Sequence, residues 1–176
     1  MQSIPNTTFT ATNFGGSNLA IRGVGTTAVS TSGDSGVGIH INDMPLVAPG
    51  LVTTEIFDMQ RVEVLRGPQG TLFGRNATAG VVNFITNKAS TKQIQAFGEF
   101  EYGNYNSIKL TGMFNFPIND KLAIRASGIY IKRDGYTTNL WNDEDIDGRD
   151  NYALRGAVHW EPTEKLTVDL MIGYGA

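Results

Sequence analysis

Apolar side chains recur at every second position in five segments between residues 94 and 174. They always fall on even-numbered positions, while polar or charged side chains occupy most of the odd positions between them. Because successive side chains of a β-strand point to opposite faces, each segment is predicted to be a strand with one apolar face. The alternating apolar positions of these strands span residues 94–102, 108–116, 122–130, 152–160 and 166–174.

The other face of these strands carries charged groups, among them Glu99, Lys109, Arg125, Arg155 and Asp169. An apolar band facing lipid, backed by a polar interior, is typical of transmembrane β-barrels. The predicted strands of roughly 10 to 13 residues approach the length that a tilted membrane strand needs. A soluble antiparallel sheet with one buried face is the alternative. Against it, the charged face is unsuited to a second sheet, and no helical segment follows to cover the apolar face.

Aromatic residues gather toward the ends of the apolar face. Tyr and Trp combine an apolar ring with a polar tip, so they favour the boundary between membrane and water. The residues predicted to form such belts are Tyr102, Phe114, Phe116, Tyr130, Tyr152, Trp160 and Tyr174.

The lengths of the connections predict an orientation. Residues 116–121 and 161–165 are short and contain Pro, Asn and Asp, which favour tight turns, whereas residues 133–151 form a long polar stretch. Outer-membrane barrels have short periplasmic turns and longer outer loops. We therefore expect the long stretch, and the short link at 103–105, to face the medium.

Five strands are too few to close a barrel, and open sheet edges in lipid would leave backbone groups unpaired. We therefore expect a partial barrel, with about five strands of a large one, in a piece of a longer protein. We also expect residues 1–176 alone to aggregate or to fold only in part. No secretory signal is recognisable at the start, and we attribute this to a missing N-terminal portion.

Composition narrows the possible functions. The chain contains no cysteine, which excludes disulfides, thiolate metal ligands and cysteine nucleophiles within it. The net charge of −3 and the lack of a basic run argue against a nucleic-acid partner. No stretch approaches the roughly 18 apolar residues of a transmembrane helix.

Residues 1–90 follow a different pattern. Short apolar runs at 37–41, 62–65 and 81–85 are separated by glycine-rich segments, which predicts a compact α+β domain. Asn42 and Asp43 are a plausible hairpin tip, residues 51–59 a possible short helix, and residues 66–79 a loop-rich segment. The change to strict alternation places a domain boundary near residues 87–91.

Three motifs in this region resemble the plug domain of TonB-dependent outer-membrane receptors. Residues 58–86 read DMQRVEVLRGPQGTLFGRNATAGVVNFIT, and two earlier motifs are IRGVG at 21–25 and GVGIHINDMP at 36–45. The resemblance covers roughly residues 20–87 and is followed by barrel-type strands. It implies that residues 1–88 are the C-terminal part of the plug, and residues 92–176 the first strands of the barrel.

The resemblance also implies a function. In this family the plug sits inside a barrel of about 22 strands, and substrate binds above it from outside. The TonB–ExbB–ExbD complex then pulls on a TonB box, which this chain lacks, to admit the substrate. The implied partners are this complex, outer-membrane lipid and a small molecule or metal chelate, such as a siderophore complex. The implied location is the outer membrane of a Gram-negative bacterium. The alternative is a passive or adhesive barrel with a static insert.

Three charged residues of the plug motif, Arg61, Glu63 and Arg66, are candidates for contacts with the barrel wall. The planar guanidinium of arginine binds carboxylates through two hydrogen bonds and stays charged, which suits a releasable contact. A solvated strand face, or a salt bridge within the plug, is the competing interpretation.

An acidic run at 143–148, DEDIDG, matches the first half of a calcium-binding loop, with Asp143, Asp145 and Asp147 as candidate ligands. Position twelve of such a loop is Leu154 rather than Glu, so only a weak structural Ca²⁺ site remains as a hypothesis beside a solvated acidic loop.

No catalytic residue or other cofactor is assigned. Residues 33–36, GDSG, resemble a serine-protease nucleophile loop, but both histidines, His40 and His159, follow the serine rather than precede it. Trp141 and Tyr136 in the predicted outer loop are candidates either for ligand stacking or for packing on the rim.

Overall fold

The computed structural model of the protein describes residues 7–11, 17–25, 36–46, 56–74, 76–141 and 143–176. The chain divides into two compact units, Met1–Thr86 and Asn87–Ala176. Among the described residues, no helix has the length and apolar character needed to cross a membrane.

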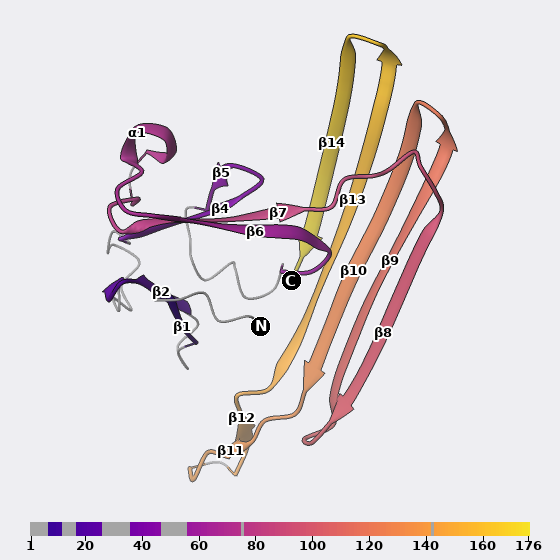
Figure 1. Cartoon of the computed structure of the whole chain (residues 1–176). Coiled ribbons are helices and arrows are strands. Elements are labelled where there is room, and N and C mark those ends of the chain that lie inside the picture. The colour runs from indigo at the N-terminus through magenta and orange to yellow at the C-terminus, as the bar shows by residue number, and fades with distance from the viewer. Residues whose placement is uncertain (1–6, 12–16, 26–35, 47–55, 75, 142) are drawn as a thin grey trace. The chain divides into compact units, whose positions relative to one another are not determined.

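Two small sheets make up the described part of the first unit (Figure 1). One contains β1 (Thr7–Ala11), β2 (Ser17–Ile21) and β3 (Val24–Gly25) in that order. The other has the order β5-β4-β7-β6 and contains β4 (Val37–Ile41), β5 (Met44–Pro45), β6 (Met59–Arg66) and β7 (Gly80–Thr86).

Strands β4 and β7 are parallel, and the short helix α1 (Gly70–Phe73) lies between β6 and β7 in sequence. Buried Ile21, Val37 and Val82 form the core of this unit, with Val64 and Phe84 packed against them. Parallel strands are buried on both faces, which explains why β4 and β7 read as nearly continuous apolar runs.

The short strands predicted at 37–41, 62–65 and 81–85 are confirmed by β4, β6 and β7. The predicted helix at 51–59 is wrong where it can be judged, because residues 56–58 are not helical and Met59 begins β6. Residues 51–55 lie outside the described residues.

The second unit is an antiparallel sheet of five long strands in the order β14-β13-β10-β9-β8 (Figure 1). They are β8 (Gln95–Gly103), β9 (Ser107–Asn119), β10 (Leu122–Arg133), β13 (Arg149–Thr163) and β14 (Leu166–Gly175). All five predicted strands are confirmed, and β9, β10 and β13 extend beyond the alternating pattern. The predicted long loop is accordingly shorter and contains a small hairpin of β11 (Thr137–Thr138) and β12 (Asp145–Ile146).

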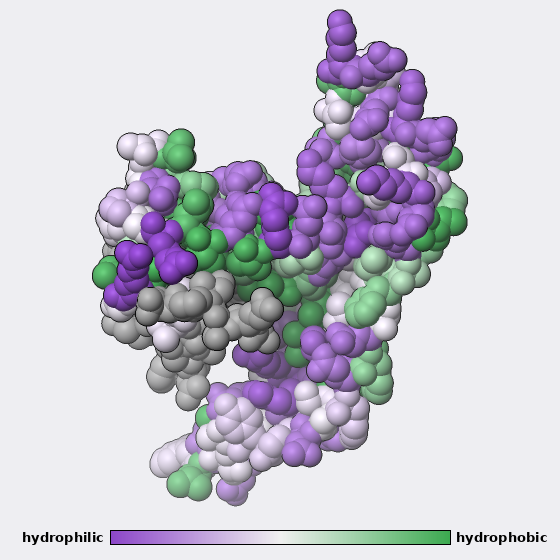
Figure 2. All heavy atoms as spheres, in the orientation of Figure 1, coloured by the Kyte–Doolittle hydropathy of each residue, from purple (hydrophilic) through white to green (hydrophobic). Residues whose placement is uncertain are grey.

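Even and odd positions face different surroundings in the central strands. Ile124 is 42% exposed, whereas its neighbours Ala123 and Arg125 are 0% and 6% exposed. We call the side of the odd positions the inner face and that of the even positions the outer face. In the view of Figure 2, hydrophilic residues cover the upper part of these strands, and hydrophobic residues lie along their right-hand edge.

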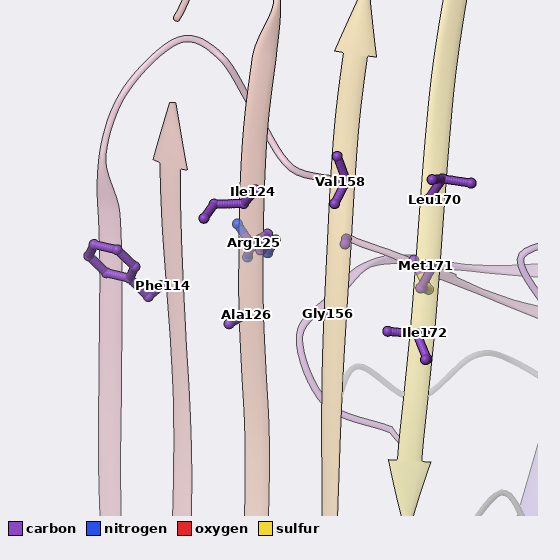
Figure 3. Close-up of a pocket in the computed structure, with 10 residues that line it drawn as sticks. Phe114, Ile124, Arg125, Ala126, Gly156, Val158, Leu170, Met171 and Ile172 are labelled. Carbon is purple, nitrogen blue, oxygen red and sulfur yellow. The ribbon is translucent and has the colours of Figure 1, made fainter. Parts of the chain in front are cut away.

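The outer face is apolar, and among the described residues its large side chains, such as Leu110, Leu170 and Ile172, are exposed. It has a shallow hollow where Ala126 and Gly156 are register partners, bordered by larger side chains (Figure 3). The bordering residues include Phe114, Ile124, Val158, Leu170 and Ile172. Large exposed apolar surfaces are unfavourable in water, so this face indicates contact with lipid or with another protein surface.

Candidate functional site

The β4–β5 hairpin of the plug motif is fastened to β7 through side chains. Asn42 and Asp43 both adopt positive φ, 50° and 66°, as a tight hairpin turn requires. The amide of Asn83 donates to the Asp43 carboxylate at 2.7 Å, and its oxygen accepts from the Asp43 backbone N–H at 3.2 Å. Thr86 donates its backbone N–H to Asn42 Oδ1 at 3.0 Å. The predicted hairpin tip is therefore present and bonded to the middle and end of β7.

Asn83 is completely buried, and it was not identified from the sequence. It falls within the apolar run of β7, and an amide in a buried run is the only signal that could have marked it. Its amide also donates to Glu63 Oε2 at 3.5 Å, so it lies between the hairpin and β6.

Arg61 and Glu63 form an ion pair with each other, with 2.7 Å between Arg61 Nε and Glu63 Oε1. The hydrogen bond from Arg61 holds the pKa of the Glu63 carboxyl below its ordinary value, and the Asn83 amide acts in the same direction. Both side chains are largely exposed. Arg66 ends β6 and is exposed. Contact of these residues with a barrel wall stays a prediction.

His40 lies in the plug unit beneath helix α1. Its ring is 2% exposed and meets the ring of Phe73 edge-on at 5.0 Å. Burial lowers the pKa of His40, although the nearby Asp43 carboxylate and a hydrogen bond with the Phe73 backbone act in the opposite direction. Within the described residues, its Nδ1 atom has no hydrogen-bond partner. A neutral imidazole therefore suits this position.

Aromatic and cationic side chains meet where β10 leads into the small hairpin. The Arg133 guanidinium lies 4.7 Å from the centre of the Tyr136 ring, and the rings of Tyr105 and Tyr136 are 6.0 Å apart. The amide of Asn106 donates to the Asp134 carboxylate at 2.5 Å. Trp141, at the end of the small hairpin, is 95% exposed and therefore free to meet a ligand or partner.

The acidic run has a different arrangement from a calcium loop. Asp145 lies in β12 and accepts a hydrogen bond from the Thr138 hydroxyl at 3.0 Å, while Asp143 and Asp147 adopt positive φ in the flanking turns. In the described part of the chain, no three His, Cys, Asp or Glu side chains converge as metal ligands would. A Ca²⁺ site at Asp143, Asp145 and Asp147 stays a prediction.

The inner face of the sheet contains a further polar cluster. The sequence placed its residues on the polar face but did not predict that they contact one another. The imidazole of His159 lies between the carboxylates of Asp169, at 2.7 Å, and Glu161, at 3.1 Å. Lys88 Nζ donates to Asp169 at 2.6 Å.

The residues of the protease-like motif, 33–35, lie outside the described residues.

The first unit is similar to a known protein family. The model of the TonB-dependent receptor plug domain matches residues 1–81. Over 108 residues the chain is 32% identical to the pesticin receptor of Yersinia pestis, covering 60% of this chain and 15% of that receptor. Over 127 residues it is 28% identical to the vitamin B12 transporter BtuB of Vibrio vulnificus, covering 70% of this chain and 20% of that protein.

The fold of the whole chain has a counterpart among solved structures. It aligns with the ferric yersiniabactin uptake receptor FyuA from Yersinia pestis with a TM-score of 0.79 and 22% identity, covering 99% of this chain and 28% of that one. The chain thus spans less than a third of the proteins to which it is similar. Residues 1–81 thus match the plug domain of TonB-dependent receptors, and the chain as a whole has the fold of part of a solved receptor of this kind.

Proposed function

We propose that this chain is part of a receptor in the outer membrane of a Gram-negative bacterium. The receptor binds a scarce nutrient at the cell surface and imports it into the periplasm by energy-coupled movement of the plug. The observation that carries the proposal is the succession of two patterns. A plug-family match over residues 1–81 is followed directly by a sheet with an exposed apolar outer face and a polar inner face.

The composition of the plug unit supports movement rather than a permanent seal. Its described core is small, and much of its cohesion comes from polar contacts such as those of Asn83 and Asn42. A domain with little buried apolar surface has a modest free energy of unfolding. Mechanical work from the TonB–ExbB–ExbD complex would therefore rearrange it at a lower free-energy cost than unfolding a larger apolar core.

A metal chelate or another compact, polar small molecule is the proposed substrate class, with a siderophore–metal complex as the first candidate. The relatives named above include receptors for ferric yersiniabactin and vitamin B12. Arg133, Tyr136 and Trp141 are the side chains of this chain that we propose to meet substrate, since a cation and stacked rings suit an anionic, partly aromatic chelate.

The proposal is tested by comparing nutrient uptake in cells that contain the complete receptor with uptake in cells from which it has been deleted. Iron-labelled siderophores and labelled cobalamin would be offered separately, with and without a functional TonB–ExbB–ExbD complex. We expect one of these compounds to lose uptake on deletion of the receptor and equally on loss of the complex. Uptake that depends on the receptor but not on the complex would indicate a passive barrel instead.

A further inference from the structure

The segment that follows the plug motif is bonded to the inner face of the sheet at two places. We call residues 88–93 the strap. Near its start, Lys88 Nζ donates to Asp169 Oδ2 on β14 at 2.6 Å. Further along, Ser90 and Gln93 bond to the side chain of Asn115 on β9. Strands β13 and β10 lie between β14 and β9, so the strap crosses the inner face (Figure 1).

The dimensions agree with this path. Three strand spacings separate β14 from β9, which is roughly 14 Å at about 4.8 Å per strand. Two extended residues, from Lys88 to Ser90, span roughly 7 Å, and the long Lys88 side chain covers the remainder. The strap is therefore nearly taut between its two attachments.

Asn115 uses its whole amide to hold the strap. Its Oδ1 accepts from the Ser90 backbone N–H at 2.8 Å, and its Nδ2 donates to the carbonyls of Ser90 at 2.8 Å and Gln93 at 2.9 Å. The side chain is completely buried. A buried amide that serves one backbone segment with three bonds is built to fix that segment in place.

At the other attachment, the carboxylate of Asp169 lies between the ammonium group of Lys88 and the imidazole of His159. One oxygen accepts from Lys88, and the other faces His159 Nδ1 at 2.7 Å. The second ring nitrogen of His159 faces Glu161 at 3.1 Å. Carboxylates only accept hydrogen bonds, so the two contacts suit a doubly protonated imidazole, with which the charges would alternate along the cluster.

Two buried residues in this region have small side chains. Ala123, the register partner of His159, is 0% exposed, and Ala89 in the strap is 6% exposed. Both the buried alanines and the two attachments agree with a strap that lies against the inner face of the sheet.

We propose that Asn115, Asp169 and His159 act as positioning residues that clamp the strap to the barrel wall while the plug is moved. The inference rests on the proposed function. It adds a boundary: force applied to the plug displaces residues before Lys88, whereas Ala89 onward stays attached to the sheet. The clamp therefore gives the plug a fixed point of attachment to the sheet.

Two matched cysteine variants of the complete receptor test the clamp. Ala77→Cys is placed in the plug unit and Ala89→Cys in the strap; both alanines are buried, at 2% and 6% exposure. Cells would be treated with a membrane-impermeant maleimide during energised uptake. We expect Ala77→Cys to react and Ala89→Cys to react on the order of tenfold more slowly. Equal rates would overturn the clamp.

Weakening the attachments provides the second measurement. Asn115→Ala should raise the labelling rate of Ala89→Cys on the order of tenfold, because the strap then opens locally. If Asn115→Ala does not assemble, Lys88→Met, at an exposed side chain, gives the same comparison. Lys109→Met is the control, since Lys109 pairs with Glu101 on the same face and has no bond to the strap among those described. A rate unaffected by both attachment variants would also overturn the clamp.

Uptake measured in the same cells separates this inference from the proposed function. If uptake is the same with and without the receptor, the proposed function is contradicted, but the clamp is not. The labelling rates of Ala89→Cys in the resting receptor, with and without the attachment variants, still decide whether the clamp exists.

Discussion

The side chain of Asn115 pairs with both backbone groups of Ser90, 25 positions earlier in the chain, in the way that a neighbouring strand would. The N–H of Ser90 donates to the amide oxygen, and the carbonyl of Ser90 accepts from the amide nitrogen, both at 2.8 Å. One side chain thus provides the hydrogen bonds that an irregular segment cannot obtain from a sheet.

Replacing Asn115 by Asp tests the donor half of this arrangement. A carboxylate can still accept from Ser90, but it cannot donate to the carbonyls of Ser90 and Gln93. Both hydrogen bonds are part-buried, and losing each should cost about 0.5–1.5 kcal/mol. We expect a clear fall in the unfolding temperature of the complete receptor in detergent, and faster hydrogen exchange at the Ser90 amide.

Asn119→Asp is the matched control for that substitution. Asn119 is exposed and uses only its oxygen, which accepts from the Lys121 N–H at 2.9 Å. An aspartate can take over this role, so stability should stay near that of the unchanged receptor. Equal losses at positions 115 and 119 would show that donation by Asn115 contributes nothing.

Gly80, at the start of β7, tolerates no side chain. A Cβ atom there would lie 2.3 Å from the Leu65 carbonyl oxygen and 2.8 Å from Ile21 Cδ1. Gly80→Ala should therefore separate β6 from β7 and destabilise the plug unit by about 1–3 kcal/mol or more. Protease sensitivity of the plug in the complete receptor measures this. Gly70→Ala, with open space at its Cβ, should leave the sensitivity unchanged.

The outer face predicts the effect of a charge placed on it. Ile172 is 76% exposed and lies in the row of register partners with Gly156 and Ala126. If this row faces the middle of the bilayer, Ile172→Arg should cost about 2–4 kcal/mol, whereas Ile172→Phe should be tolerated. The yield of folded, heat-modifiable receptor in membranes reports the difference. Equal yields for both variants would argue against contact with lipid.

Acid should weaken the plug unit through His40. Burial lowers the pKa of His40 in the folded plug, while the unfolded chain takes up a proton near pH 6.5. Unfolding therefore binds protons, and stability is lost as the pH falls from about 6.5 toward the lower folded value. Hydrogen exchange of β4 amides should quicken over this range, and His40→Phe should remove most of the change. An unchanged pH dependence in His40→Phe would assign the effect to other groups.

The alternation of side chains was sufficient to predict all five long strands, because a strand exposed to different surroundings on its two faces must alternate. The Arg61–Glu63 pair was also foreseeable, since positions two apart in a strand share a face. The role of Asn115 was not foreseeable, because it depends on the path of a segment with no periodic pattern. The extra length of β13 likewise comes from pairing with β10 and β14 rather than from its own residues.

The strap also has a consequence for the order of assembly. Its partner Asn115 lies on the first hairpin of the sheet, within 25 positions of Ser90, so this attachment can form early. Asp169 is 81 positions beyond Lys88 and belongs to the fifth long strand. A contact between distant positions waits until the intervening chain has been ordered. The two ends of the strap therefore become fixed at different times. The Lys88–Asp169 contact forms only after the five long strands have paired.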